Sequence, residues 1–205
     1  MIRIITDSTS DFTAEQANRL GVDHIVPMKV NFGEEEYLAG VTISNEEFYA
    51  KLAQSKELPF TTLVTAAEYA QVYESFPEDD LLVLPLSAAL SGSYQSACMA
   101  QQASGRENIY VVDTKAVCLA LSLLVHAASL LRAQGNSAAD CYNELNALVP
   151  KLRMVAAVDT LEYLVKGGRL SRAASIVAQT LNVKPLIALE DGQIVSSAKA
   201  RSMKG

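Results

Sequence analysis

The sequence predicts an α/β fold in which an N-terminal parallel sheet is flanked by helices and is followed by part of a smaller α+β domain. Short runs rich in β-branched residues and Leu alternate with helix-like stretches over the first 150 residues, a pattern typical of a parallel sheet covered on both faces. Two of the predicted strands lead into helices through loops rich in hydroxyl side chains. The chain then changes character near Pro150, after which strand-like runs and helical stretches are mixed in an α+β pattern.

The element boundaries follow from hydrophobic runs and cap residues. We expect strands at residues 3–6, 24–31, 81–85 and 108–113, each followed by turn or cap residues. We expect helices at residues 13–20, 44–54, 66–75, 94–103, 115–133 and 138–148. The expected helix N-caps are Asp11 or Thr13, Ser44, Thr65 and Ser137, and the expected C-terminal stops are Gly21 and Gly135.

Residues 1–150 are predicted to form the α/β domain, and residues 151–205 an incomplete second domain. The second part begins with the strand-like run RMVAAV and ends with two apolar runs joined by Asp191 and Gly192. An Asp-Gly pair between alternating runs predicts a β-hairpin. Because a ribbon with one more strand and two helices offers little core of its own, we expect a further segment or a partner chain to complete this domain.

Composition and charge exclude several classes of protein. Half of the 205 residues are hydrophobic, so the chain can bury a sizeable core, and its net charge of −6 argues against a nucleic-acid-binding protein. The three cysteines form no CxxC pair and no metal pattern with the two histidines, so we expect free thiols in a reducing cytoplasm, no metal and no cofactor. The apolar run at residues 116–131 is short for a membrane span. We expect it to form a helix buried between layers, without stable membrane insertion.

The most informative stretch is LLVLPLSAALSGSYQSACMAQQ, residues 81–102. It predicts a buried strand, a loop of small and hydroxyl residues, and then a helix. Such a turn aims free backbone N–H groups and the positive end of the helix dipole at one point, which attracts an anion. Ser87, Ser91 and Ser93 add hydroxyl donors there. The loop at residues 6–11 is of the same kind, so the two loops together predict an anionic ligand at the carboxyl edge of the sheet.

Ser91 has three interpretations: a ligand donor, a helix cap or a nucleophile. The nucleophile is disfavoured because Ala89 and Ser93 occupy the glycine positions of a G-x-S-x-G elbow. The available bases also disfavour it. His24 starts a strand and is expected at the surface or an edge, and His126 lies mid-helix in an apolar run, where a core histidine is expected. A Ser-His hydrolase is therefore poorly supported.

The remaining polar motifs can be ligand contacts or purely structural. Asp7 and Ser8, in TDSTSD, either orient donors around a ligand or form an Asx turn with a helix cap. Thr61 and Thr62 follow Pro59 in an extended stretch and have no capping role, which makes them candidates for ligand contact. A local basic set either docks an acidic partner or phosphate or is solvated surface charge; it comprises Lys166, Arg169, Arg172, Lys199, Arg201 and Lys204. Neither GxxxxGK[ST] nor GxGxxG occurs, so nucleotide binding through those loops is unsupported.

Four motifs in this order resemble the DegV family of bacterial fatty-acid-binding proteins. They are TDSTSDF, LSAALSGSYQSA, DTLEYLVKGGRLS and KPLIALEDGQI…KAR. The resemblance implies a two-domain α/β protein that buries a long-chain fatty acid of the C14–C18 class and holds its carboxylate with hydroxyls. It also implies a non-catalytic, lipid-carrying subunit of a fatty acid kinase. A separate ATP-binding kinase subunit would phosphorylate the bound fatty acid, giving acyl-phosphate for phospholipid synthesis.

The resemblance assigns roles by position. The serine of the family's LSG motif falls on Ser91 and a second carboxylate ligand on Thr61; the flanking ligand positions are Thr62, Gly92 and Ser93, and the supporting loop is Asp7 and Ser8. The family's GGR arginine falls on Arg169 and its late KxR arginine on Arg201, both implied in docking the kinase or steadying phosphate. Two departures stand out. Leu63 and Val64 replace a Gln-Pro pair, and family members continue past residue 205 to a Gly-rich segment whose His helps hold the carboxylate.

The physical chemistry of a fatty acid is consistent with this resemblance. Burying roughly 16 methylenes is worth on the order of 10 kcal/mol of transfer free energy before ordering costs. A buried carboxylate needs several donors to offset its lost hydration, and hydroxyls with helix N–H groups supply them. The alternative is an enzyme, a hydrolase or sugar-kinase relative that acts on a small anionic substrate. That alternative predicts a wet polar pocket with a base near Ser91.

Overall fold

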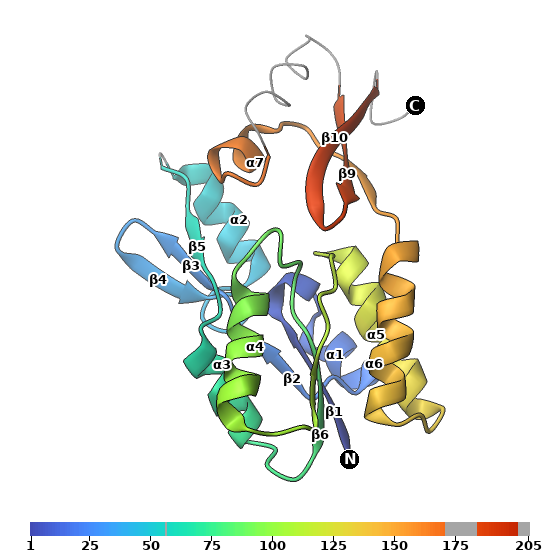
Figure 1. Ribbon diagram of the computed structural model, residues 1–205. Coiled ribbons are helices and arrows are strands. Elements are labelled where there is room, and N and C mark those ends of the chain that lie inside the picture. The colour runs from blue at the N-terminus through green and yellow to red at the C-terminus, as the bar shows by residue number, and fades with distance from the viewer. Residues whose placement is uncertain (56, 171–183, 201–205) are drawn as a thin grey trace. The chain divides into compact units, whose positions relative to one another are not determined.

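Four parallel strands, in the order β2-β1-β6-β7, form the larger sheet (Figure 1). The computed structural model describes residues 1–55, 57–170 and 184–200. The strands of this sheet are β1 (Ile2–Asp7), β2 (His24–Val26), β6 (Asp80–Leu84) and β7 (Ile109–Val111). In the central strands β1 and β6, residues 4–7 and 81–84 are fully buried, including Ile4, Ile5, Leu82 and Val83. This burial is expected of parallel strands covered on both faces.

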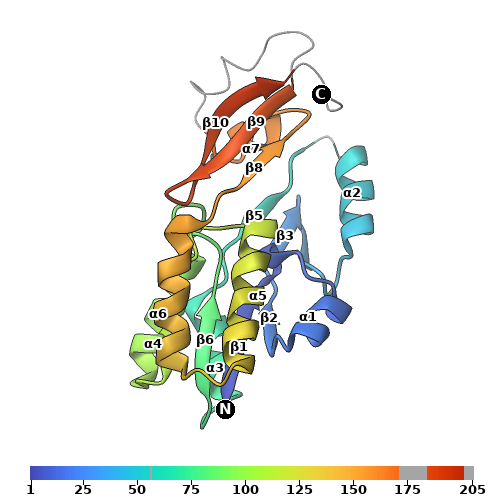
Figure 2. The same cartoon turned by 90° about the vertical axis from the view of Figure 1, so that its right-hand side faces the viewer.

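Helices cover the two faces of this sheet. The pair α3 (Ala66–Glu74) and α4 (Ser93–Ser104) lies on one face, and α5 (Leu119–Ala133) and α6 (Ala138–Leu148) lie on the other (Figure 2). Helix α1 (Ala14–Leu20) is tied to α5 by hydrogen bonds from Arg132 to the carbonyls of Leu20 and Gly21. The predicted α/β fold class is confirmed.

Local capping fixes most of the predicted helix starts. Thr13, Ser44 and Thr65 each form a capping box, in which the hydroxyl accepts from the backbone N–H three residues on while the side chain there accepts from the cap's own N–H. Ser137 caps α6. Gly21 ends α1 with a φ of 63°, a conformation that favours glycine. These predicted caps are confirmed.

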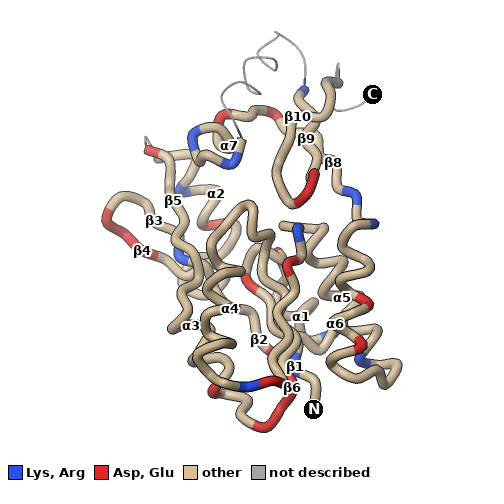
Figure 3. The backbone as a smooth tube through the Cα atoms, viewed as in Figure 1, with Lys and Arg blue, Asp and Glu red and all other residues tan. Residues whose placement is uncertain are grey.

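The single strand predicted at residues 24–31 is wrong. The chain breaks at Pro27, which has no N–H to continue a ladder, and β3 (Lys29–Phe32) belongs to a second, antiparallel sheet. In that sheet β3 lies between β4 (Glu35–Leu38) and β5 (Phe60–Thr62). Helix α2 (Asn45–Gln54) packs on it around a small apolar cluster of Val30, Phe32, Ile43, Tyr37, Ala39, Phe48 and Leu52. Acidic residues follow one another at the tip of the β3–β4 hairpin, which is red in Figure 3.

The helix predicted at residues 115–133 begins four residues late. Lys115 and Cys118 have φ values of 48° and 52°, which a right-handed helix cannot contain. The expectation of a helix buried between layers is also wrong, because α5 exposes Leu119, Leu123 and Leu130. His126 is exposed on the same helix and is not a core histidine. Among the described residues, no helix is both long and apolar enough to span a membrane.

The chain divides into two compact units, Met1–Lys151 and Leu152–Gly205. The first ends with the short helix η2 (Val149–Lys151). In the second, β8 (Val155–Ala157), β9 (Lys184–Glu190) and β10 (Gln193–Ala200) form a sheet in the order β10-β9-β8, with α7 (Glu162–Lys166) and a core of Leu161, Leu170 and Ile187. The predicted hairpin at Asp191 and Gly192 is confirmed, with φ values of 47° and 80° at its two turn residues.

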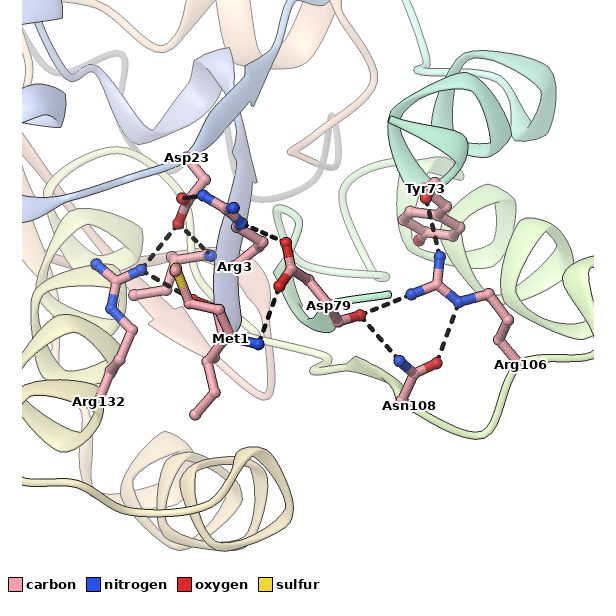
Figure 4. A network of polar contacts seen from close by, with 10 residues as sticks. Met1, Arg3, Asp23, Tyr73, Asp79, Arg106, Asn108 and Arg132 are labelled. Carbon is pink, nitrogen blue, oxygen red and sulfur yellow. Dashed lines mark hydrogen bonds and ion pairs between the residues drawn. The ribbon is translucent and has the colours of Figure 1, made fainter. Parts of the chain in front are cut away.

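Ion pairs join the elements at the amino edge of the parallel sheet (Figure 4). Arg3 pairs with Asp23 at 2.9 Å and with Asp79 at 2.8 Å. Arg132 of α5 pairs with Asp23 at 2.8 Å, and the amino group of Met1 with Asp79 at 2.9 Å. This network lies at the opposite edge from the hydroxyl-rich loops and fastens β1 to its neighbours.

Candidate functional site

The first hydroxyl-rich loop is organised by the carboxylate of Asp7 at the end of β1. Asp7 is fully buried and accepts hydrogen bonds from the Thr9 N–H at 2.9 Å, the Thr9 hydroxyl at 2.5 Å and the Leu86 N–H at 2.8 Å. Burial raises the pKa of this carboxyl, although these bonds act in the opposite direction. Asp7 therefore joins the ends of β1 and β6 and has no free face for a ligand.

Ser8 begins the short helix η1 (Ser8–Ser10), which follows directly. Its hydroxyl accepts from the Met28 N–H at 3.0 Å and so connects the first loop to the start of β3. Asp7 and Ser8 thus hold the loop through backbone partners, and their role in supporting a ligand stays a prediction.

The second loop, between β6 and α4, carries the serines of the LSG motif. The N–H groups of Leu90 and Ser91 both donate to the Ser87 carbonyl, at 3.0 and 3.2 Å. Gly92 is the N-cap of α4 and provides no side-chain cap. A Cβ at Gly92 would lie 2.9 Å from the end of the Leu63 side chain, so the turn and the residue after β5 are close together.

The structure brings the two predicted ligand segments together. The Val64 N–H, just after β5, donates to the Ser93 hydroxyl at 3.1 Å. Ser93 is fully buried, and its hydroxyl lies 3.0 Å from the Ser91 hydroxyl. Thr62, on the same β5 segment, accepts from the Asn31 side chain at 3.3 Å. Thr61 and Thr62 therefore lie on a strand whose continuation is hydrogen-bonded to the LSG turn.

A third loop, residues 113–118 after β7, connects the other two and was not identified from the sequence. The Cys118 N–H donates to the Thr9 carbonyl at 2.8 Å, and the Ser87 N–H donates to the Ala116 carbonyl at 2.8 Å. Cys118 has φ 52° and ψ −134°, a strained combination for a residue with a Cβ. The sequence offered one signal, the position of this loop after a strand of the same sheet.

A cavity of about 450 Å³ lies between the first loop, the third loop and the antiparallel sheet of the first unit. Of the predicted site residues, Ser8 and Thr61 line it, whereas Asp7, Thr62, Ser91, Gly92 and Ser93 do not. Much of the wall is apolar and was not predicted, notably Met28, Val30, Ile43, Phe48, Tyr49 and Val117. The apolar residues of β3 and α2 were the available signal, but they do not distinguish a packed core from a lined cavity.

One carboxyl and one thiol lie in the described wall of the cavity. Cys118 and Asp11 both line it, and the thiol is hydrogen-bonded to the carboxylate. Burial, with Asp11 nearby, raises the pKa of Cys118 to about 12, and burial raises the pKa of Asp11 as well. No Lys, Arg or His is found among the described residues that line the cavity. An anionic group at its edge would be held by hydroxyls and backbone N–H groups.

The other predicted residues lie elsewhere. Arg169 belongs to the second unit, where its guanidinium donates to the Gly167 carbonyl at 2.6 Å. Arg201 lies outside the described residues. His24 is on the edge strand β2, as predicted, and burial lowers its pKa. The three cysteines are free thiols, as predicted, and the described part of the chain holds no group of three or more His, Cys, Asp or Glu that could bind a metal ion.

Comparison with known proteins identifies the family. Residues 1–205 match the family described as uncharacterised protein, DegV family. A DegV domain-containing protein of Caldanaerobacter subterraneus subsp. tengcongensis is 34% identical over 205 residues, which are 99% of this chain and 72% of that protein. Protein DegV of Bacillus subtilis is 30% identical over 206 residues, which are 99% of this chain and 73% of that protein.

Solved structures agree with this match. The structure described as fatty acid binding of a DegV family protein from Thermus thermophilus has a TM-score of 0.88 at 34% identity and covers 99% of this chain and 72% of its own. A stearic acid-binding protein from Eubacterium ventriosum has a TM-score of 0.89 at 31% identity, covering 100% and 72%. Taken with the folded positions of its motifs, these matches establish that the chain belongs to the DegV family.

Proposed function

We propose that this chain binds a long-chain fatty acid, with the carboxylate held by the hydroxyls of Ser91 and Thr61 and the acyl chain in the cavity of the first unit. The observation that carries this proposal is the hydrogen bond from the Val64 N–H to Ser93. It joins the segment that follows Thr61 in β5 to the LSG turn of Ser91, which supports a shared site for the two hydroxyls.

The cavity suits an acyl chain in size and lining. Its volume of about 450 Å³ lies within the range of small-molecule sites, and Phe48, Val30 and Ile43 supply apolar wall. Thr61 lines the same cavity, so a carboxylate at Thr61 leaves its tail beside that wall. Neutral donors also leave a carboxylate oxygen without a competing cation, which is compatible with later phosphorylation. The solved relatives described as fatty-acid-binding support the same ligand class.

Binding can be tested directly on the purified chain. We would remove bound lipid and titrate palmitate, stearate and oleate, with native mass spectrometry to give the stoichiometry. Ser91→Ala and Thr61→Ala should each weaken binding by about 1–3 kcal/mol, the value of a hydrogen bond to a charged group. Ser104→Ala is the matched control, because Ser104 is exposed at the far end of α4, the helix that follows the Ser91 turn. If both site variants bound fatty acid with the affinity of the wild type, the proposed carboxylate site would be contradicted.

The second part of the proposal is that the chain is a non-catalytic carrier that presents its fatty acid to a separate ATP-binding kinase subunit in the cytoplasm. Arg169 and Arg201 are the proposed docking residues. A mixture of the loaded chain, the kinase subunit and ATP should form acyl-phosphate, and neither protein should do so alone. Arg169→Ala should lower the rate while leaving fatty-acid affinity unchanged. Acyl-phosphate formed by this chain alone would make it an enzyme and overturn the carrier role.

A further inference from the structure

Ser93 is the most constrained hydroxyl of the LSG turn. It is fully buried, its oxygen accepts from the Val64 N–H at 3.1 Å, and it lies 3.0 Å from the Ser91 hydroxyl. Ser91 is only partly buried, and its oxygen also accepts from the Ser93 N–H at 3.2 Å. A side chain enclosed in this way has no surface to offer a ligand, so Ser93 must act through a neighbour if it acts at all.

Counting protons decides which of the two serines donates in the shared bond. Each hydroxyl has one proton and two lone pairs. If Ser91 donated, Ser93 would accept twice, and its own buried proton would have no acceptor among the contacts of the described chain. A buried donor without an acceptor is unfavourable. If Ser93 donates, every buried group is paired, and the Ser91 oxygen accepts two bonds while its proton remains available.

From this bookkeeping we propose that Ser93 is a positioning residue that sets the polarity of a hydrogen-bond relay from the Val64 N–H through Ser93 to Ser91. The relay fills both lone pairs of Ser91 and points its one proton outward. The Ser91 O–H is then already oriented to donate a hydrogen bond to a carboxylate. This inference rests on the proposed function, since the outward proton matters only if an anion binds there.

The relay also couples the two ligand segments. Val64 follows β5, in which Thr61 pairs with Val30 of the antiparallel sheet. The Ser93 hydroxyl therefore does two things: it holds Val64, after β5, in place, and it sets the direction of the Ser91 proton. Chains of hydrogen bonds polarise one another in a poorly solvated site, so the charge of a bound carboxylate would strengthen the bonds behind Ser91.

A double-mutant cycle separates this relay from a purely structural role. Fatty-acid dissociation constants would be measured for wild type, Ser91→Ala, Ser93→Ala and the double variant, with thermal unfolding of each. We expect each single change to weaken binding by at least about fivefold, and Ser93→Ala to add less than twofold once Ser91 is alanine. Ser93→Thr, which keeps the hydroxyl, should restore most of the affinity. Additive effects of the two alanines would overturn the relay, because Ser93 would then act independently of Ser91.

A measurement without ligand keeps the relay testable if binding fails. Serine hydroxyl exchange would be followed by NMR, through the deuterium isotope shift of each Cβ in mixed H₂O and D₂O. We expect slow exchange at Ser93 and fast exchange at Ser91; a protected Ser91 proton with an unprotected Ser93 proton would overturn the proposed polarity. If the chain bound no fatty acid but showed slow hydroxyl exchange at Ser93 and fast exchange at Ser91, the proposed function would be refuted and the relay supported. Wild-type binding that is insensitive to Ser91→Ala would refute both the carboxylate site and the relay.

Discussion

The buried carboxylate of Asp7 accepts a hydrogen bond from the Leu86 N–H at 2.8 Å, linking the carboxyl ends of two adjacent parallel strands. Its burial outweighs its hydrogen bonds and raises the pKa of Asp7 in the folded chain. Folded protein therefore keeps a proton at Asp7 at pH values where unfolded protein has lost it. By linkage, the contribution of Asp7 to stability is complete below the ordinary Asp pKa and falls as pH rises through the raised folded value.

This sign can be checked with Asp7→Asn, which cannot titrate. Urea unfolding of wild type and variant between pH 3 and pH 7 should show the difference in unfolding free energy, wild type minus variant, decreasing as pH rises. A difference that increases over this range would mean that the hydrogen bonds outweigh burial. Substitution should also destabilise the fold by about 1–3 kcal/mol, because an amide N–H would face the Leu86 or Thr9 N–H.

Tyr69 carries the buried side-chain oxygen that has no hydrogen-bond partner in the described part of the chain. The residue is fully buried in α3, and burial raises the pKa of its hydroxyl well above the ordinary value. Removing an unpaired polar group without changing the packing should stabilise the fold by about 1–3 kcal/mol. We expect Tyr69→Phe to raise Tm by several degrees, since 1 kcal/mol corresponds to roughly 2–4 °C at this chain length.

Tyr73, one turn further along the same helix, provides the control. It is equally buried, but its hydroxyl donates to the Ala97 carbonyl at 3.2 Å. Tyr73→Phe leaves that carbonyl without this donor and should lower Tm. A rise in Tm for Tyr69→Phe and a fall for Tyr73→Phe would establish that the effect depends on whether the hydroxyl has a hydrogen-bond partner. Equal decreases in both variants would show that Tyr69 has a partner in solution.

Features encoded by neighbouring residues could be predicted from the sequence. Capping boxes such as Thr65 with Glu68 and the Asp191-Gly192 turn depend on residues within four positions of each other, so their signals are complete in a short window. The parallel sheet followed from the alternation of strands and helices. The positions of the two hydroxyl-rich loops followed from hydroxyl residues placed where a strand meets a helix.

Features built by distant residues could not be predicted. The break at Pro27 sends β3 into a second sheet, where its partner β5 begins about 30 residues later. Nothing local to either strand specifies that pairing. The cavity has the same origin, because Cys118 meets the first loop through the Thr9 carbonyl, more than 100 positions away in sequence. Burial of Ser93, which turns a predicted ligand contact into a proposed positioning residue, likewise depends on Val64.

Asp23 is the shared acceptor of the network at the amino edge of the sheet. Its carboxylate accepts from Arg3 at 2.9 Å, Arg132 at 2.8 Å and the Ile4 N–H at 2.9 Å, and its side chain is 15% exposed. Asp23→Ala would leave two guanidinium groups and a strand N–H without this acceptor. We expect a loss of about 1–3 kcal/mol in urea unfolding, with added salt changing it little. Glu144→Ala, which removes an exposed carboxylate of α6, should stay within about 0.5 kcal/mol of wild type; an equal loss in both would contradict the role of Asp23.

Cys118 adopts φ 52° and ψ −134° immediately before α5, where a Cβ is strained. Cys118→Ala and Cys118→Gly both remove the thiol and its bond to Asp11, so comparing them isolates the backbone. Relief of strain is worth about 1–3 kcal/mol, whereas the extra freedom of glycine in the unfolded chain costs about 0.5–1 kcal/mol. We therefore expect the glycine variant to be the more stable of the two by about 1 kcal/mol.

The control lies within α5, where Ala127→Gly should instead destabilise the fold by about 1 kcal/mol, because Ala127 has ordinary helical geometry. Equal losses of stability for Cys118→Gly and Ala127→Gly would mean that Cys118 is unstrained in solution.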